Sequence, residues 1–228
     1  MIKLDVRLEG FEKTRAMLLG RSKQVRFATA VALTKTANDI KAAIPAALDQ
    51  ALDRPTPFTK QGTFVTRADR ASLEAVVGFK DKQAEYMKFQ IAGGVRSPGA
   101  GGLRLPTAIQ LNAFGNIPRG VIAKLIAVAR KEGNLTKGVS RRIRVSRSVE
   151  LFYGDPKDVG GRKFPRGIYK DVDLGGGRSQ LVPLIVFPNR PASYKKRFDF
   201  VALASRVVRS NWRRNFDQAL ADALRTAR

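Results

Sequence analysis

The sequence lacks the residue types on which most catalytic and metal sites depend. It contains no cysteine, which excludes disulfides, thiolate catalysis and cysteine-ligated metals. It contains no histidine, and this removes the usual zinc sites, the serine–histidine–aspartate triad and the most common general base. The 19 carboxylates are spread along the chain, without an H-E-x-x-H motif or an aspartate-rich loop. We therefore expect no enzyme, no cofactor and no metal site.

Long apolar runs and nucleotide-binding motifs are also missing. No run of about 18 apolar residues occurs, so the sequence predicts no membrane span and no membrane partner. The opening residues, MIKLDVRLEGFEK, lack the apolar core of a signal peptide, and we expect the protein to be made and kept in the cytoplasm. Neither G-x-x-x-x-G-K-[ST] nor G-x-G-x-x-G is found in the glycine-rich stretches, so nothing predicts a nucleotide cradle.

Positive charge is what the chain has in excess. Its 43 lysines and arginines against 19 acids give a net charge of +24, far beyond the magnitude of about 2–8 that keeps a small domain soluble. Two segments are especially basic: Arg119–Arg147 has nine basic residues and one acid, and Lys195–Arg228 has nine basic residues and three acids. This predicts a polyanionic neighbour: nucleic acid, an acidic membrane surface or an acidic protein. The alternative is an ordinary solvated surface.

Two amphipathic helices are predicted towards the two ends of the chain. In Ser22–Leu52, apolar residues recur at three-, four- or five-residue steps, which places them on one face of a helix. Pro45 is expected to kink or break this helix. The second helix, Asp199–Thr226, has Asp199 as its expected N-cap. Its apolar stripe comprises Val201, Ala204, Val208, Trp212, Phe216, Leu220 and Leu224.

The two long helices are expected to pack on each other or on the same sheet, with Trp212 and Phe216 largely buried. Three shorter helices are predicted at Phe11–Leu19, at Lys82–Ala92 with Asp81 as its cap, and at Val121–Lys131. Short strands are predicted at Ile2–Leu8, Thr63–Thr66, Leu73–Phe79, Pro106–Leu111, Val149–Tyr153, Ile168–Val172 and Gln180–Phe187.

Glycine and proline mark the turns between these elements. Gly175–Gly177 is predicted to be a hairpin turn, and Pro183 restricts its strand to a sheet edge or a bulge. The pattern as a whole predicts an α+β fold, in which a small, mostly antiparallel sheet packs with a long N-terminal helix and a C-terminal helix. We expect one domain over residues 1–228, with flexible insertions near 93–105, 132–148 and 154–178.

The candidate contact residues are all basic. Residues 132–148 carry no acid after Glu132, which predicts a flexible basic arm. The arm contains no aromatic residue, which argues against a stacking platform for single-stranded nucleic acid. The residues expected to contact a polyanion or a neighbouring subunit are Lys137, Arg141, Arg142, Arg144 and Arg147 of the arm and Arg206, Arg209, Arg213 and Arg214 of the C-terminal helix.

One segment resembles a known family. The sequence LPTAIQLNAFGNIPRGVI, Leu105–Ile122, resembles the corresponding stretch of bacteriophage minor tail protein Z. The opening is similar as well, with a glycine and a short helix before a long alanine-rich helix. More broadly, the element order resembles the tail-completion, or head–tail joining, family of tailed phages. Members of that family have an arginine–proline segment before the last helix, which here reads Phe187-Pro188-Asn189-Arg190-Pro191-Ala192.

The resemblance implies a structural role without catalytic residues. Its implied form is a ring of copies, six-fold or alternatively twelve-fold, at the head-proximal end of the phage tail or at the neck. The implied partners are other tail, neck or connector proteins, with packaged DNA passing nearby, and the implied location is the virion after synthesis in the host cytoplasm. Two alternatives stay open: a nucleic-acid-binding protein that uses residues 137–147 and the C-terminal helix, and a hydrolase or nuclease that uses carboxylates and a metal.

Overall fold

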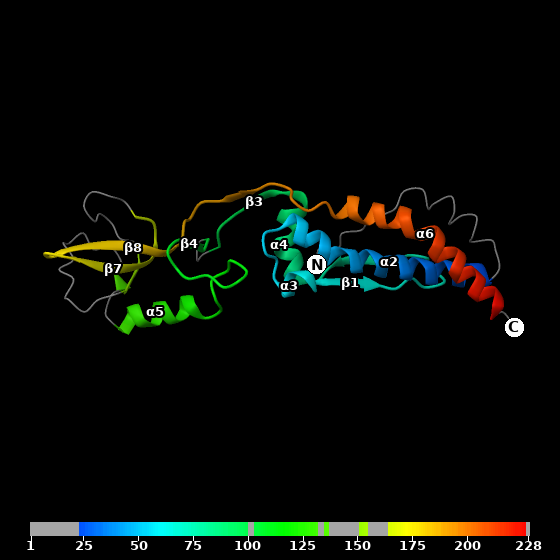
Figure 1. Ribbon diagram of the computed structural model, residues 1–228, viewed down its shortest axis with the longest axis horizontal. Coiled ribbons are helices and arrows are strands. Elements are labelled where there is room, and N and C mark those ends of the chain that lie inside the picture. Colours follow the sequence, from blue (N-terminus) through cyan, green and yellow to red (C-terminus); the bar gives the residue numbers. More distant parts are fainter. Residues whose placement is uncertain (1–22, 100–102, 132–134, 137–150, 155–163, 227–228) are drawn as a thin grey trace. The chain divides into compact units, whose positions relative to one another are not determined.

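The computed structural model describes residues 23–99, 103–131, 135–136, 151–154 and 164–226 (Figure 1). The fold class is α+β, as predicted. The chain divides into two compact units, where the sequence predicts one domain: unit 1 comprises Met1–Gly94 and Tyr194–Arg228, and unit 2 comprises Val95–Ser193. The apolar residues of unit 2, among them Ile168, Ile185 and Phe187, form a core of their own. The predicted elements Ile2–Leu8 and Phe11–Leu19 lie outside the described residues.

Unit 1 contains the two long helices, α2 over Lys23–Ala51 and α6 over Phe200–Arg225. They lie side by side, which confirms the predicted packing (Figure 1). Asp199 is the N-cap of α6, as predicted, and its side chain accepts a hydrogen bond from the Ala202 N–H at 3.0 Å. Part of the contact is made by small side chains, which let the two backbones approach closely; they are Ala28 and Ala32 of α2 and Ala219 and Ala223 of α6.

The sequence predicts a kink or a break at Pro45, and α2 continues through the proline without a break. Proline removes the hydrogen bond to the carbonyl four residues earlier, here that of Lys41. Lys41 is exposed, so water can hydrate that carbonyl. Ile44 and Leu48, on either side of the proline, are fully buried, and their burial holds the helix against the core.

The buried face of α6 differs from the predicted stripe at both ends. Val201 is 50% exposed and Leu224 is 59% exposed. A strict four-residue step advances about 40° beyond a full turn of 3.6 residues, so such a stripe leaves the contact face along a long helix. Trp212 and Phe216 are partly buried and stack on each other, with ring centroids 5.7 Å apart. The buried residues of α6 are Phe200, Ala204, Val208, Asn215, Ala219 and Ala223.

A two-stranded sheet and two short helices complete unit 1. Strand β1, Thr63–Thr66, matches its prediction, and it pairs antiparallel with β2, Val76–Phe79. β2 begins three residues later than predicted, and Leu73 instead has a positive φ of 49°. Helix α3 spans Pro57–Lys60, and α4 spans Asp81–Ala92. The N-cap of α4 is Lys80 rather than Asp81, which lies in the first turn.

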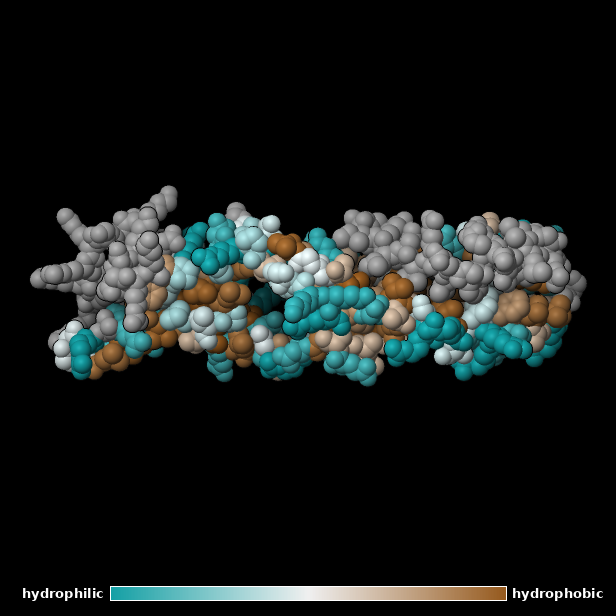
Figure 2. Space-filling model, turned by 90° about the horizontal axis from the view of Figure 1, so that it is seen from above, coloured by the Kyte–Doolittle hydropathy of each residue, from teal (hydrophilic) through white to brown (hydrophobic). Residues whose placement is uncertain are grey.

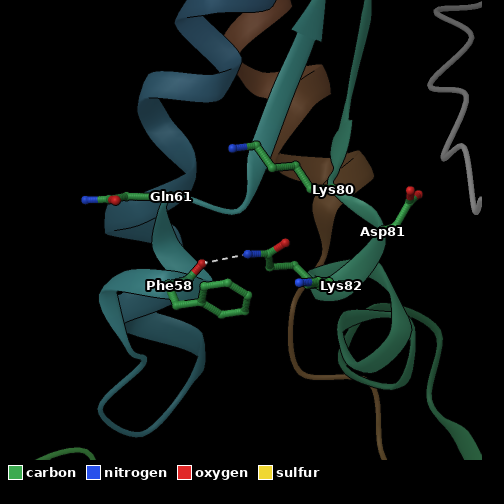
Figure 3. Close-up of a pocket in the computed structure, with 6 residues that line it drawn as sticks. Phe58, Gln61, Lys80, Asp81 and Lys82 are labelled. Atoms are coloured by element: carbon green, nitrogen blue, oxygen red, sulfur yellow. Dashed lines mark hydrogen bonds between the residues drawn. The ribbon is translucent and has the colours of Figure 1, made fainter.

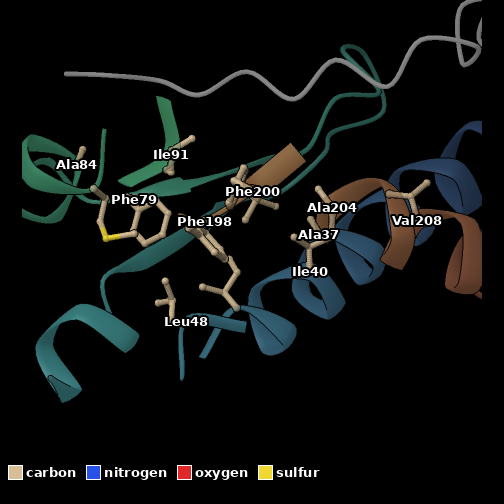
Figure 4. Packing of buried hydrophobic residues seen from close by; sticks show 13 residues of the cluster. Ala37, Ile40, Leu48, Phe79, Ala84, Ile91, Phe198, Phe200, Ala204 and Val208 are labelled. Atoms are coloured by element: carbon tan, nitrogen blue, oxygen red, sulfur yellow. The ribbon is translucent and has the colours of Figure 1, made fainter. Parts of the chain in front are cut away.

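Aromatic side chains fill the centre of unit 1 (Figure 4). The ring of Phe79 lies 6.4 Å from that of Phe198 and 5.9 Å from that of Phe200, measured between centroids. Ile40 and Leu48 of α2 belong to the same cluster. The core therefore joins the strand pair to both long helices.

Unit 2 is built on a five-stranded sheet in the order β4-β8-β7-β6-β5. Neighbouring strands are antiparallel except β5 and β6, which are parallel. Helix α5, at Val121–Lys131 as predicted, contributes Ile122, Leu125 and Ile126 to a cluster around Ile168 and Ile185. The strands are β4 Leu105–Pro106, β5 Leu135–Thr136, β6 Leu151–Gly154, β7 Gly167–Gly175 and β8 Arg178–Val186.

The β7–β8 hairpin confirms both local predictions made for it. Gly175, Gly176 and Gly177 form its end with φ values of 77°, 62° and 73°, a backbone region that glycine enters without strain. The register passes from Ile168 opposite Ile185 to Tyr169 opposite Pro183. The pairing therefore skips one residue on β8, so that Pro183 lies at a bulge.

The chain passes between the units at β3, Gly94–Arg96, and β9, Ala192–Tyr194, which pair with each other. β3 and the first residue of β4, Leu105, lie in the stretch 93–105, which the sequence predicts to be a flexible insertion. Gly93, just before β3, has a φ of 73°, and a Cβ there would lie 3.0 Å from the carbonyl oxygen of Tyr194. Glycine is therefore needed where these two segments approach.

Candidate functional site

The four predicted contact residues of α6 are all exposed, and three of them share a face. Arg206, Arg209 and Arg213 are spaced i, i+3 and i+7, which keeps them within about 60° around the helix. Arg214 lies on the adjoining face. Arg213 is 3.8 Å from Asp217, an exposed i,i+4 pair. The five predicted residues of the arm, Lys137, Arg141, Arg142, Arg144 and Arg147, lie outside the described residues.

A groove that the sequence did not predict runs along α2. It lies between the outer face of this helix and the loop joining β1 to β2, and its volume is about 640 Å³. We call it the α2 groove. The sequence signal was the apolar pair Phe27 and Val31, at i and i+4 on the helix face that the periodicity assigns to polar residues. The groove is lined by Phe27, Ala30, Val31, Thr34, Lys35, Asn38 and Asp39 of α2 and by Arg67, Ala68, Asp69 and Arg70 of the loop.

Hydrogen bonds hold the loop side of the groove in place. The Ala68 N–H donates to Thr34 Oγ1 at 3.0 Å, and the Thr34 hydroxyl donates to the Ala30 carbonyl at 2.9 Å. The Asp69 carboxylate accepts the N–H groups of Ser72 and Ala71 at 2.7 and 2.6 Å. These backbone donors, Ser72 first, lower the pKa of Asp69. The groove is therefore preformed.

The groove combines an apolar floor with a basic rim. Phe27 and Val31 are each 39% exposed, and the Arg70 guanidinium lies 4.7 Å from the Phe27 ring centroid, a cation–π distance. Arg67 and Arg70 are exposed and make no ion pair within the described part of the chain.

The two acids of the groove are already engaged. Asp69 holds its own loop, and Asp39 accepts hydrogen bonds from Asn211 at 2.9 Å and Asn215 at 2.8 Å. Both carboxylates keep their negative charge, so the lining has three cationic side chains, Lys35, Arg67 and Arg70, against two acids. The groove therefore combines its apolar floor with a small net positive charge.

A second, smaller pocket lies between α3 and the start of α4 (Figure 3). Its volume is about 430 Å³. The Gln83 side chain crosses it and donates from Nε2 to the Phe58 carbonyl at 3.1 Å. A Cβ on Gly62 would lie 2.2 Å from Gln83 Cγ, so the absence of a side chain at Gly62 makes room for this bond. The pocket therefore lies where the Gln83–Phe58 hydrogen bond links α3 to α4.

The described residues offer no candidate metal site. Among them, no group of three or more acidic side chains lies close enough to hold a metal ion. A search of the same residues finds no helix with the length and apolarity needed to cross a membrane.

Comparison with known proteins assigns no family to the chain. No protein-family model, no curated protein and no solved structure matches it. Its function must therefore be inferred from its own residues and their geometry.

Proposed function

We propose that this chain is a virion structural protein, a tail-completion or neck component that forms a ring at the head-proximal end of a phage tail. Its action is assembly rather than catalysis, and its partners are copies of itself and neighbouring tail, neck or connector proteins. The sequence resemblance of Leu105–Ile122 to minor tail protein Z supports this role. The main observation behind the proposal is the solvent exposure of apolar side chains in that same segment.

The segment Leu105–Ile122 presents large apolar side chains to solvent. Leu105 is 47% exposed, Leu111 39% and Phe114 38%. Apolar side chains also remain between polar ones elsewhere on the surface (Figure 2). Large apolar side chains that are exposed within one short segment are candidates for protein–protein contact. A subunit that is completed by its neighbours in a particle would present such a segment when it is alone.

The exposed segment is ordered by its own hydrogen bonds. Asn112 Oδ1 accepts the N–H groups of Phe114 and Asn116, both at 3.0 Å. The Asn112 N–H donates to the Asn116 carbonyl at 2.9 Å, and the Gly115 N–H donates to the Asn112 carbonyl at 2.9 Å. The backbone around Phe114 is thus held in one conformation before any partner arrives, which reduces the entropy cost of binding.

The positive net charge of the chain also supports a position next to a polyanion. A net charge of +24 repels other copies of the chain unless negative charge is supplied nearby. DNA passing through a ring, or acidic neighbours in the particle, would supply it.

A cryo-electron map of the intact particle tests the proposal. We expect the chain in a closed ring at the head-proximal end of the tail, with six copies, or twelve in the alternative symmetry. The replacement Phe114→Ser should reduce incorporation into particles, whereas Ala113→Ser, at an exposed position beside it, should not. Particles that assemble and infect normally without this chain would refute a structural role.

A second candidate function is nucleic-acid binding by α6. The observation that favours it is the exposed strip of Arg206, Arg209 and Arg213. Such a strip would contact phosphates rather than base edges, because nothing in it selects a sequence. Tight binding of free DNA by the isolated chain, weakened steeply by salt, would favour this function over the first.

A further inference from the structure

We propose that the side of unit 2 on which helix α5 packs binds the phosphates of duplex DNA. We call this surface the α5 face, and its described cations are Lys124 and Arg130 of α5, Arg166 just before β7, and Lys170 of β7. The inference goes beyond the proposed ring, because it concerns a surface that a single copy of the chain already has. It also differs from the second candidate function, which places the phosphates on α6.

Unit 2 carries positive charge that its own acids do not balance. Its described residues include seven arginines and three lysines but only two acids, Asp171 and Asp173. The described residues of unit 1 include 19 cations and ten acids, and all the ion pairs found in the described part of the chain lie in unit 1. The positive charge of unit 2 is therefore left for an anion from outside the chain.

The two acids of unit 2 lie on the other side of its sheet. Ile168 of β7 packs with the apolar residues of α5, so its side of the sheet is the one beside α5 (Figure 1). Side chains alternate along a strand, which places Lys170 on the same side as Ile168 and places Asp171 and Asp173 on the opposite side. Tyr169 agrees with this alternation, because it packs with aromatic rings outside the α5 cluster. No acid among the described residues of unit 2 therefore lies on the α5 face.

The outer side of α5 is open to a phosphate backbone. Ile122 packs towards the sheet, and Lys124 lies about 160° away from it around the helix, so Lys124 points away from the sheet. The neighbouring residues Ala123 and Ala127 are exposed and small, so they leave room for a close approach. Arg130 is exposed at the flank of the same helix. Side chains of these two basic types commonly contact phosphate oxygens.

Arg166 is held in place on the α5 face. Its Nη2 donates to the Tyr153 hydroxyl at 2.7 Å, and its guanidinium lies 5.5 Å from the Tyr153 ring centroid. Tyr153 is paired with Ile168 across the sheet, so both side chains lie on the side of α5. Arg166 is exposed, and a guanidinium has further N–H groups with which to donate to a phosphate. Because the side chain is already positioned, its loss of freedom on binding is small.

Charge of one sign over a whole surface favours DNA over an acidic protein. Protein–protein interfaces have few charged residues at their centre, whereas protein–DNA interfaces are strongly positive. Duplex DNA presents one phosphate charge about every 1.7 Å along its axis, so cations spread over a helix, a loop and a strand can each meet one. Such contacts carry no sequence information, and we expect binding to be independent of DNA sequence.

The arginine strip of α6 is a weaker candidate for the same DNA. Asp217 lies 3.8 Å from Arg213 within that strip, and Asp222 is paired with Arg225 further along the helix. A carboxylate beside a phosphate site repels the phosphate and occupies its arginine. The described residues of the α5 face include no such carboxylate.

Salt-dependent DNA binding by the full chain tests the α5 face. The probe is a fluorescein-labelled duplex of about 20 base pairs, and its anisotropy is followed from roughly 50 to 200 mM salt. The triple variant Lys124→Gln, Arg130→Gln and Lys170→Gln should make the log–log salt slope less steep by about 2.7, at roughly 0.9 per phosphate contact. Glutamine is used because it retains a long side chain and a good helix propensity.

A matched variant in unit 1 separates the α5 face from net charge. The control carries Lys23→Gln, Lys41→Gln and Lys82→Gln, which remove the same charge from exposed helical positions and should leave the slope unchanged. An equal change of slope in the two triple variants would overturn the proposal, and so would the absence of DNA binding by the wild type at the lowest salt. Lys170→Gln alone alters one exposed side chain and should reduce the slope by about 0.9, which keeps the test decisive if the triple variant folds less well.

Competition separates DNA from an acidic protein partner. Poly-L-glutamate is added at the same concentration of negative charge as unlabelled duplex. It should displace the labelled duplex less than the unlabelled duplex does, because a flexible chain loses conformational entropy on binding and a stiff duplex does not. Equal or stronger displacement by poly-L-glutamate would favour an acidic protein and overturn the assignment to DNA.

The inference and the proposed function can fail separately. A particle map with a ring of this chain whose α5 face lies against protein rather than DNA would overturn the inference and retain the function. DNA binding through the α5 face by a chain that is absent from particles would do the reverse.

Discussion

At the scale of single residues, Asn215 is the most constrained polar side chain in the contact between α2 and α6. It is fully buried, and its Nδ2 donates to Thr36 Oγ1 at 3.1 Å and to Asp39 Oδ2 at 2.8 Å. Small apolar side chains make up the contact near it, and these can slide along one another. The polar bonds form at only one register, so Asn215 specifies how the helices align.

Asn215→Ala should lower the free energy of unfolding by about 1–3 kcal/mol, because it removes the donor to the buried Thr36 hydroxyl and one of the two donors to Asp39. Urea denaturation measures the change. Ser210→Ala, at an exposed position of the same helix, is the control and should change stability little. Equal stability of Asn215→Ala and the wild type would show that the polar bonds contribute nothing.

Gly62→Ala should destabilise unit 1 by about 1–3 kcal/mol, the usual cost of overpacking. The added Cβ would lie 2.2 Å from Gln83 Cγ, and Gln83 is buried and bonded to Phe58. Thermal denaturation measures the effect. Gly99→Ala is the matched control, since a Cβ there meets nothing within 4 Å. A normal melting temperature for Gly62→Ala would mean that Gln83 moves aside without cost.

The loop beside the α2 groove should loosen in acid. The pKa of Asp69 is lowered in the folded state by the N–H groups of Ser72 and Ala71. A lowered folded pKa means that this contribution to stability is complete above the ordinary aspartate pKa of about 3.9 and is lost as pH falls through the folded value. Amide exchange of Ala71 and Ser72, normalised for intrinsic pH dependence, should show loss of protection there. Asp69→Ala should lack this change, and persistent protection in acid would contradict it.

At the scale of elements, the continuous α2 is the main surprise. Proline in a helix interior costs roughly 3 kcal/mol, and α2 bears this cost because Ile44 and Leu48 are buried beside it. The local tendency of Pro45 to interrupt a helix is outweighed by packing against the rest of unit 1, which an isolated helix would lack. Local sequence therefore predicted the helix, and of the predicted kink or break at Pro45 the break does not occur.

Pro45→Ala should stabilise the protein by up to about 3 kcal/mol, because it restores a backbone donor in mid-helix. Some of the gain is offset by the greater freedom of alanine in the unfolded chain. Chemical denaturation measures the net change. Ala46→Gly, at the exposed next position, should act in the opposite direction by up to about 1 kcal/mol. A loss of stability in Pro45→Ala would mean that the proline ring itself is required by its surroundings.

At the scale of the whole molecule, the main feature is the net charge of +24. The described arginines Arg206, Arg209 and Arg213 share one face of α6, and the predicted arm adds Lys137–Arg147. If the α6 strip contacts duplex DNA, replacing its three arginines by serine should make the log–log salt slope less steep by about 2.7, at roughly 0.9 per phosphate contact.

Fluorescence anisotropy at several salt concentrations measures that slope. Arg225→Ser is the control, because Arg225 lies on the same helix but is paired with Asp222 at 3.0 Å. An unchanged slope after removal of the three strip arginines would mean that α6 does not face phosphates. The remaining slope would then belong to other basic residues.

The elements whose signals are local could be predicted from the sequence. Periodic apolar spacing placed α2, α5 and α6 within a residue or two, and the glycine run placed the β7–β8 turn. Asp199 as an N-cap and Pro183 at a bulge were also predictable, because each depends on one residue and its immediate neighbours. The contact residues on α6 were placed on the surface for the same reason.

Features that depend on contacts between distant segments could not be predicted from the sequence. The division into two units depends on which apolar residues share a core, and spacing along the chain does not reveal that. The α2 groove exists because Ala68, in the β1–β2 loop, bonds to Thr34 on α2, and no local pattern joins those residues. Asn215 looks like an ordinary polar position in the sequence, and it is buried because α2 covers it and supplies its acceptors. Each of these features comes from contacts between segments, whereas periodicity describes only one segment at a time.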